Sequence, residues 1–405
     1  MLANLRSGPL SGIKNTALLL DSCGLPRYWA TVWSMFLPVD LAESTVRKKL
    51  SHIESFYQHS DEILGPGQLD DALAAFDLEA LNAALEGFFF VIRNQSRTSP
   101  ASEDRWQTTL RFVTEILQRV TRSQPDQESI WELHGRLERL ELLHSKLHVG
   151  SRHRPEQIRS LPSEVVEFLY ELLDPVSNVN PFRSAASRWR VFVLFILMLH
   201  QGLRRGEILL LPTDAIKTSF DRRLQENRSW ITVKYNEYED DQRYSMPGIK
   251  TASSIRQPPV SQMIALVLQE YTSSYRGRAN HSFLLNSQKH RPMSTEGVTK
   301  IFQKVSSSLP KSLRSILQSQ TGNESVTPHG LRHTCAVVRL NQFLAEGVAM
   351  DDALQRMRVF FGWSRDSDMP LRYARAVFED RLASVWRDEF DVRISVLRSL
   401  PRRSS

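Results

Sequence analysis

Cysteine, glycine and long apolar runs are scarce in this sequence of 405 residues. The two cysteines, Cys23 and Cys335, exclude a disulfide framework and a cysteine-rich zinc module, and they suit a reducing cytoplasm. Glycine accounts for 17 residues, below the usual share of about 7%, which favours helices over turn-rich sheets. The longest apolar run, Val191–Leu199, is far shorter than the ~20 residues of a membrane helix, and the N-terminus lacks the pattern of a signal peptide. We therefore expect a cytoplasmic protein that makes no contact with a membrane.

Motifs that bind common cofactors are also missing. No P-loop, dinucleotide fingerprint or cluster of metal ligands is visible. The sequence therefore predicts no cofactor, no metal site and no use of ATP. With 41% hydrophobic and 24% charged residues the composition is that of a folded protein, and the length predicts two or three domains.

Charge is divided unevenly along the chain. The formal net charge is +7, but residues 1–150 hold 15 basic and 19 acidic side chains, a net charge of −4. Residues 151–405 hold 37 basic and 26 acidic side chains, a net charge of +11. A basic excess suits an acidic partner such as nucleic acid, so we expect that partner to bind chiefly to the second part of the chain.

The first 150 residues predict an all-helical domain without strands. Apolar residues recur at helical spacing in four segments, residues 41–64, 78–94, 102–122 and 127–147. A polar and basic segment, residues 151–162, contains Pro155 and Pro162 as breakers. We interpret this segment as the linker between two domains.

Residues 163–390 predict a second domain of helices with a small β-sheet. Helices are expected over 162–174, over 185–203 and from Ser261 almost to the end, and β-branched and aromatic residues predict strands at 230–235, 244–250 and 255–260. Residues 391–405 form a short amphipathic tail that suits docking onto a neighbouring copy. The predicted fold class is mainly α with a small antiparallel β-sheet, an α+β protein.

Four segments of the second domain stand out, because each contains arginine, lysine, histidine or tyrosine in a distinctive motif. They are HQGLRRGEILLLPTDAI (200–216) with Arg204 and Glu207, IKTASSIRQPPV (249–260) with Lys250, TPHGLRHT (327–334) with His329, Arg332 and His333, and FFGWSRDSDMPLRYAR (360–375) with Trp363 and Tyr373. Any one of them is a weak signal, but the order and spacing of all four are specific.

This order resembles the tyrosine recombinase (phage integrase) family, in which Arg-x-x-Glu, a β-turn Lys, His-x-x-Arg, Gly-His/Trp and Tyr follow one another. The resemblance covers roughly residues 160–390, and the preceding helices fit the family's core-binding domain. It implies a site-specific DNA recombinase or integrase that cuts and rejoins DNA strands through a 3′-phosphotyrosine intermediate, without metal or ATP.

The resemblance also implies how the phosphate is attacked. Arg204 and Arg332 would grip its non-bridging oxygens in a bidentate manner, with Glu207 orienting Arg204. Tyr373 would be the nucleophile, and the two guanidinium groups would lower the pKa of its phenol. Arg205 is the alternative to Arg204 if the register differs by one residue.

Lys250 and the histidines would move the protons. Lys250 would act as general acid on the leaving 5′ oxygen, with Lys234 as the rival candidate. His329 would exchange protons with Tyr373 and hydrogen-bond a phosphate oxygen. His333 is expected to be a structural helper, with a buried core histidine as the alternative.

Trp363 occupies the position where many family members have histidine. Its indole N–H is a donor only, so it can bind a phosphate oxygen but cannot transfer a proton. A core tryptophan is the alternative interpretation. The chain also departs from the family in spacing, because Tyr373 lies ten positions after Trp363 and not nine, with Pro370 between them.

The implied partner is double-stranded DNA with a specific recombination site. Candidates for phosphate contacts are the basic residues of the first long helix and of the linker, namely Arg47, Lys48, Lys49, Arg152 and Arg154. A solvated charged helix face and a solvated loop are the alternatives.

The resemblance further implies a homo-tetramer on two DNA duplexes, assisted by DNA-bending or directionality proteins, in a bacterial cytoplasm and in the setting of a mobile genetic element. Two other functions stay open. A type IB topoisomerase shares this kind of catalytic set and needs no partner protomer, and a DNA-binding protein could retain the fold with a decayed site.

Overall fold

The structure is a computed structural model of the chain. It describes residues 2–4, 17–38, 41–95, 99–123, 127–149, 160–222, 225–238, 241, 243, 246–375 and 377. The chain divides into two compact units, Met1–Glu156 and Gln157–Ser405. The division falls within the predicted linker, of which residues 151–159 lie outside the described residues.

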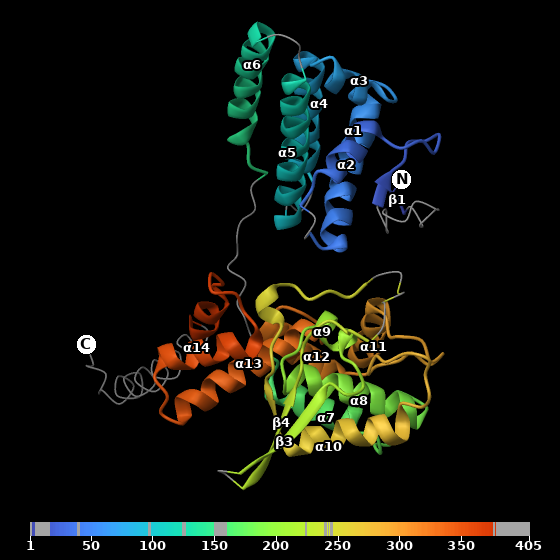
Figure 1. Ribbon diagram of the computed structural model, residues 1–405, viewed down its shortest axis with the longest axis vertical. Helices are drawn as coiled ribbons and strands as arrows, with labels where there is room; N and C mark the ends of the chain where they lie inside the picture. The colour runs from blue at the N-terminus through green and yellow to red at the C-terminus, as the bar shows by residue number, and fades with distance from the viewer. Residues whose placement is uncertain are drawn as a thin grey trace, which may run out of the picture. The chain divides into compact units, whose positions relative to one another are not determined.

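The N-terminal unit is built around one long helix, α5. The helices described in this unit are α1 (Tyr28–Met35), α2 (Glu43–Ile63), α3 (Gln68–Ala74), α4 (Leu78–Arg93), α5 (Pro100–Arg122) and α6 (Gln127–Ser145). Pro100 occupies the first turn of α5, where its missing N–H costs nothing. Phe112, Val113, Ile116 and Leu117 then form a fully buried stripe at helical spacing. The other five helices pack against α5, which makes it the centre of this core (Figure 1).

The prediction of a purely helical first domain is wrong in one respect. Two three-residue strands, β1 (Leu2–Asn4) and β2 (Ala17–Leu19), pair antiparallel in the N-terminal unit. All three residues of β2 are buried, so the strand shows no alternation of apolar and polar residues. Helices α1 and α3 were also not predicted, because eight and seven residues are too few for a periodic pattern.

The C-terminal unit surrounds the apolar helix α8. Its described helices are α7 (Ser163–Leu173), α8 (Ala185–Leu199), α9 (Arg205–Leu210), α10 (Gln262–Glu270), α11 (Thr295–Ser307), α12 (Lys311–Thr321), α13 (Pro328–Ala345) and α14 (Met350–Phe361), and residues 369–375 are also helical. Helix α8 contacts α7, α10 and α13, so it is buried on most sides (Figure 1). A second apolar cluster joins α13, α14 and the segment that contains Trp363 and Tyr373.

The sheet of the C-terminal unit has three antiparallel strands in the order β3–β4–β5, namely β3 (Ile216–Asp221), β4 (Glu226–Ile231) and β5 (Pro259–Val260). Ile216 pairs with Ile231, and Trp230 pairs with Pro259. Strand β4 begins earlier than the predicted strand at 230–235 and ends at Ile231.

Two further strand predictions fail in detail, because the apolar residues in these segments belong to a long loop. Residues 246–250 are not in a strand, and residues 244 and 245 lie outside the described residues. The strand expected at 255–260 reduces to β5 and an isolated bridge between Val233 and Arg256. Strand β3 was not predicted at all, since its sequence IKTSFD is mostly exposed and lacks an apolar face.

The predicted fold class is confirmed: the protein is mainly α-helical with a small antiparallel sheet. Within the described ranges, no helix combines the length and the apolar character needed to cross a membrane.

Candidate active site

Arg204 lies at a sharp turn between α8 and α9. Gly202 has a φ of 56°, and a Cβ at this position would lie 2.3 Å from the Phe361 ring, so glycine is required both for backbone conformation and for space. Helix α8 therefore ends at Leu199 and not at residue 203 as predicted. The backbone N–H of Arg204 donates to Glu207 Oε2 at 2.9 Å, and its Nη1 donates to Oε1 at 2.6 Å. The Arg204 side chain stays 24% exposed, which leaves it accessible to a bound phosphate.

Glu207 is a buried carboxylate shared by three arginines. Its side chain is fully buried, and Arg256 Nη2 donates to Oε2 at 3.0 Å while Arg332 Nη1 lies 4.0 Å from the same oxygen. Burial alone would raise the pKa of Glu207, but the charges of Arg256, Arg332 and Arg204 outweigh it and lower that pKa. Glu207 is therefore ionised at neutral pH and holds the guanidinium groups in place, which extends its predicted role as the partner of Arg204.

Arg332 is the deepest cation of the site. It follows the N-terminus of α13, where the Thr327 side chain accepts from the Gly330 N–H. Its Nη1 donates to the Gly202 carbonyl and its Nη2 to the Phe361 carbonyl at 2.8 Å. Burial, followed by the charge of Arg204, lowers the pKa of Arg332 to about 9. The side chain is still protonated at neutral pH, and it joins the first, third and fourth motifs.

Tyr373 is almost fully buried, with 1% of its surface exposed. Its ring stacks on Trp363, with ring centroids 5.3 Å apart and an interplanar angle of 16°, and Trp363 stacks in turn on Phe361 at 4.9 Å. The charges of Arg332 and Arg204 act on the pKa of Tyr373 in the expected direction and lower it. Burial is the larger effect, so the net pKa lies well above its usual value.

The histidine that hydrogen-bonds the Tyr373 hydroxyl is His333, through Nδ1. His333 is half-buried and lies one helical turn after the exposed His329, whose ring approaches it edge-on at 4.0 Å between centroids. The proton exchange with Tyr373 was expected of His329. In the structure His333, one turn after His329 on the same face of α13, makes the hydrogen bond to the Tyr373 hydroxyl.

Lys250 lies exposed in the long loop between β4 and β5. The following residue, Thr251, is hydrogen-bonded to Ser254, Oγ1 to Oγ at 3.0 Å. Ser254 Oγ in turn accepts from Arg204 Nη1 at 3.0 Å. These hydrogen bonds through Ser254 link the loop of the second motif to Arg204 of the first motif, while the Lys250 side chain itself is exposed to solvent.

The two alternative site residues have other partners. Lys234 Nζ forms a 2.6 Å ion pair with Glu237, three residues along the same loop. Arg205 Nη1 donates to Thr299 on α11 at 3.2 Å. Of the two arginines, Arg204 is therefore the one bound to Glu207, while the choice of Lys250 over Lys234 stays a prediction.

Residues 159–379, more than half of the chain, match the model of the phage integrase family. The chain belongs to this family. Members of the family are tyrosine recombinases, and the enzyme class predicted from the four motifs is thereby confirmed.

One solved structure is similar to this recombinase at low sequence identity. It is a crystal structure of the XerH site-specific recombinase bound to difH substrate, a pre-cleavage complex, with a TM-score of 0.36 and 13% identity. The match covers 87% of this chain and 94% of that chain. No curated protein matches the chain.

The structure describes only part of the predicted DNA-contacting set. On α2, Arg47 forms an ion pair with Glu43 at 3.0 Å and Lys48 with Asp104 at 2.5 Å, while Lys49 is half-buried. The linker residues Arg152 and Arg154 lie outside the described residues. DNA contacts by this set therefore stay a prediction for the recombinase, and two of its cations already have carboxylate partners.

Sequence reasoning missed Arg256 as a member of the site. This arginine is 5% exposed, and besides Glu207 it reaches the Phe360 carbonyl through Nε at 2.8 Å and the Ser254 carbonyl through Nη1 at 2.7 Å. It thereby ties the second motif to the first and the fourth. The segment IRQPPV gave no signal for this role, because Arg256 is buried while the neighbouring Ile255 is 53% exposed, the reverse of the usual apolar pattern.

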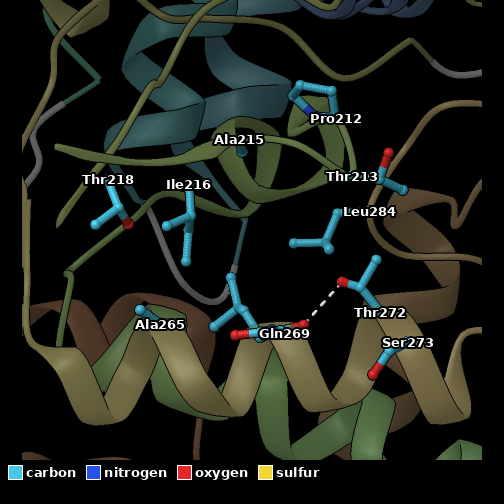
Figure 2. A pocket seen from close by; sticks show the side chains of 11 residues that line it. Pro212, Thr213, Ala215, Ile216, Thr218, Ala265, Gln269, Thr272, Ser273 and Leu284 are labelled. Carbon is cyan, nitrogen blue, oxygen red and sulfur yellow. Dashed lines mark hydrogen bonds between the residues drawn. The ribbon is translucent and has the colours of Figure 1, made fainter.

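A cavity of about 370 Å³ lies elsewhere in the C-terminal unit, between the start of β3 and helix α10 (Figure 2). It is lined by uncharged side chains, namely Pro212, Thr213, Ala215, Ile216, Thr218, Ala265, Leu268, Gln269, Thr272, Ser273 and Leu284. None of the predicted site residues belongs to this lining. Among the described residues, no group of three or more histidine, cysteine, aspartate or glutamate side chains is placed to hold a metal ion.

Proposed function

We propose that this recombinase cuts and rejoins DNA strands at a specific site through a 3′-phosphotyrosine intermediate formed by Tyr373, without metal or ATP. The observation that carries the proposal is the grouping of one tyrosine with two arginines held by Glu207. Arg332 donates to the carbonyl of Phe361, whose ring begins the stack that ends at Tyr373. The charges of Arg332 and Arg204 both lower the pKa of Tyr373 against the effect of burial. A nucleophile and two cations in this arrangement match the needs of a phosphodiester under attack.

The two arginines supply the charge that the reaction requires. Attack on the phosphorus increases the negative charge on the non-bridging oxygens, and fixed guanidinium donors stabilise this charge without reorganisation. Arg332 is fixed by two carbonyl oxygens and Arg204 by Glu207 and Ser254. Lys250, on its exposed loop, donates the proton to the leaving 5′ oxygen.

The burial of Tyr373 has a direct consequence for the reaction. A hydroxyl on a side chain with 1% exposure cannot reach a phosphate until part of its cover moves. We therefore expect DNA binding to uncover the hydroxyl, while Trp363 keeps the phenol ring stacked.

The decisive experiment traps the intermediate on a nicked suicide substrate and detects it by denaturing electrophoresis and peptide mapping. The native chain should form a covalent adduct at Tyr373 in excess EDTA. Tyr373→Phe should bind DNA with unchanged affinity and form no adduct. Tyr170→Phe is a matched control, because Tyr170 also hydrogen-bonds a histidine, His200, in the same unit, and it should react normally. An adduct in the Tyr373→Phe protein, or strict dependence on Mg²⁺, contradicts the proposal.

The assembly proposed for recombination is a homo-tetramer on two duplexes that carry the specific site, with accessory DNA-bending or directionality proteins, in the bacterial cytoplasm. Exchange between two sites needs more than one active protomer, whereas a topoisomerase acts alone. Four protomers per two duplexes by light scattering, together with recombinant products, support this assembly. Relaxation of plasmids that lack any site, without strand exchange, would instead support the topoisomerase. The tail at 391–405, expected to dock in trans, lies outside the described residues.

A further inference from the structure

The Tyr373 hydroxyl has a hydrogen-bond partner that can accept a proton. His333 Nδ1 contacts this hydroxyl directly, and the two ring centroids lie 5.6 Å apart. His333 comes from α13, immediately after Arg332, so the residue that binds the phosphate and the residue that contacts the nucleophile are rigidly linked. The His333 ring is only half-buried, so the contact lies at the border between the interior and solvent.

An indole, a carboxylate and a guanidinium of the site are not available as the base. Trp363 stacks on the phenol, but its indole N–H is only a donor. The oxygens of the Glu207 carboxylate already accept from Arg204 and Arg256, and Arg332 lies 4.0 Å away. Arg332 is a cation. Nucleophilic attack by a phenol nevertheless requires that its proton be transferred to an acceptor.

We propose that His333 is a catalytic residue of this recombinase, the general base that takes the proton of Tyr373 as the hydroxyl attacks the phosphate. This assignment rests on the proposed function and adds a residue to it. In the cleavage step the bond between Tyr373 Oη and phosphorus forms, and the bond between phosphorus and the 5′ oxygen breaks. The phenol proton moves to His333 Nδ1, and a proton from Lys250 Nζ moves to the leaving oxygen. Rejoining reverses both transfers, so no other reactant is consumed.

In the structure without DNA, the protonation states keep the proton on the phenol and leave the imidazole neutral. Burial, followed by the charges of His329 and Arg332, lowers the pKa of His333 to about 3, so the imidazole is neutral and has a free lone pair. Burial also raises the pKa of Tyr373, so the phenol keeps its proton until attack. The phosphodiester bound by the arginines brings a negative charge close to His333, which favours the imidazolium form at the moment of transfer.

The test compares single-turnover cleavage of a suicide substrate by the native chain and by His333→Asn. Asparagine keeps a polar atom near the position of Nδ1 but does not accept the proton. Because general base catalysis contributes ~10²–10⁴-fold, cleavage should slow by at least ~100-fold with unchanged DNA affinity. His200→Asn is the matched control, since it removes a histidine that also hydrogen-bonds a tyrosine, Tyr170, and it should cleave at the native rate.

Two readouts separate a base from a structural residue. A substrate with sulfur in place of the leaving 5′ oxygen should rescue Lys250→Ala, because a thiolate needs no proton, but it should not rescue His333→Asn. A fluorinated tyrosine at position 373, whose phenol ionises more readily, should recover part of the rate of His333→Asn and little of the rate of Lys250→Ala. His333→Gln provides a second variant if the asparagine protein melts early.

Each result has a separate meaning. Native cleavage rates in both His333 variants overturn the assignment, and so does rescue of these variants by the sulfur substrate. A slow variant that the fluorinated tyrosine does not improve shows that His333 is structural, which also overturns it. If the native chain itself forms no adduct, the proposed function fails. This result is obtained with the native chain alone, so it is distinct from a failure of the His333 assignment.

Discussion

Replacing Glu207 by glutamine keeps the shape of the side chain but removes the charge that three arginines share. Two of them, Arg256 and Arg332, have side chains that are only 5% exposed, so water cannot take over the role of the carboxylate. An amide oxygen can still accept one of the hydrogen bonds. The net effect of Glu207→Gln is therefore that two buried cations lose their counter-charge.

The structure sets the size of this effect. Arg256 lies 3.0 Å and Arg332 4.0 Å from Glu207 Oε2, and two unit charges ~4 Å apart attract by about 4 kcal/mol at an effective dielectric constant near 20. Breaking a buried pair by removing one partner costs about 3–5 kcal/mol. For a unit of this size each kcal/mol shifts Tm by about 2–4 °C, which predicts a decrease of about 6–20 °C.

Asp214→Asn is a matched control, because Lys217 and Asp214 are also three residues apart and also form a 2.6 Å ion pair. Both of these side chains are 47% exposed, and solvent screens such an exposed ion pair, so it contributes little to stability. Thermal unfolding followed by circular dichroism gives both Tm values, and covalent adduct formation below both transitions gives the activity. Equal Tm decreases in the two variants would refute the reasoning about buried charge.

The effect of Glu207→Gln depends on pH in a definite direction. The pKa of Glu207 is lowered in the folded chain, because the arginine charges outweigh the opposing effect of burial. A carboxylate of this kind contributes its full stability above its unfolded-state pKa, about 4.3, and loses it as the pH falls through the lower folded-state pKa. The difference in Tm between the native chain and Glu207→Gln should therefore be constant near neutral pH and shrink in acid. A difference that grows on acidification contradicts the assigned charge state.

Two further predictions concern the leaving group and the charge distribution. Lys250→Ala should slow cleavage and recover on a sulfur-substituted leaving group, whereas Lys234→Ala should cleave the oxygen substrate normally, and single-turnover rates on both substrates check this. A fragment from about residue 155 onward should bind non-specific DNA with an affinity that falls steeply with salt, and a fragment of residues 1–150, which carries a net charge of −4, should bind weakly. The reverse order in a salt titration contradicts the charge argument.

The sequence alone predicted those helices whose buried residues recur at the helical period. Helix α8 is apolar on most sides and α5 has a continuous buried stripe, so both were predicted within a few residues. The hairpin β3–β4 was missed or misplaced, because its segments IKTSFD and ENRSWI are largely exposed and carry no apolar face. The hairpin is stabilised by pairing between its two strands, and the sequence of either strand alone does not predict that pairing.

The candidate site shows the same limit. The order of motifs predicts Arg204, Lys250, Arg332 and Tyr373 as site residues, because their chemistry requires residue types at a recognisable spacing. The link between Arg256 and Glu207 joins residues 49 positions apart, and a buried arginine in a loop segment gives no signal by itself. The choice between two histidines one turn apart depends on the side from which the nucleophile approaches α13, and this is a property of the packed fold.

The fold also separates the two proton transfers that strand cleavage needs. In an in-line displacement the attacking and leaving oxygens lie on opposite sides of the phosphorus. The nucleophile Tyr373 and its partner His333 belong to the wall formed by α13 and the Trp363 stack, whereas Lys250 lies on an exposed loop. In the proposed mechanism, the base His333 and the acid Lys250 would therefore act on a phosphate held by Arg204 and Arg332 from two different parts of the fold. Because one group accepts a proton where the other donates it, two separate residues are required, and a single histidine in the place of Trp363 would not replace both.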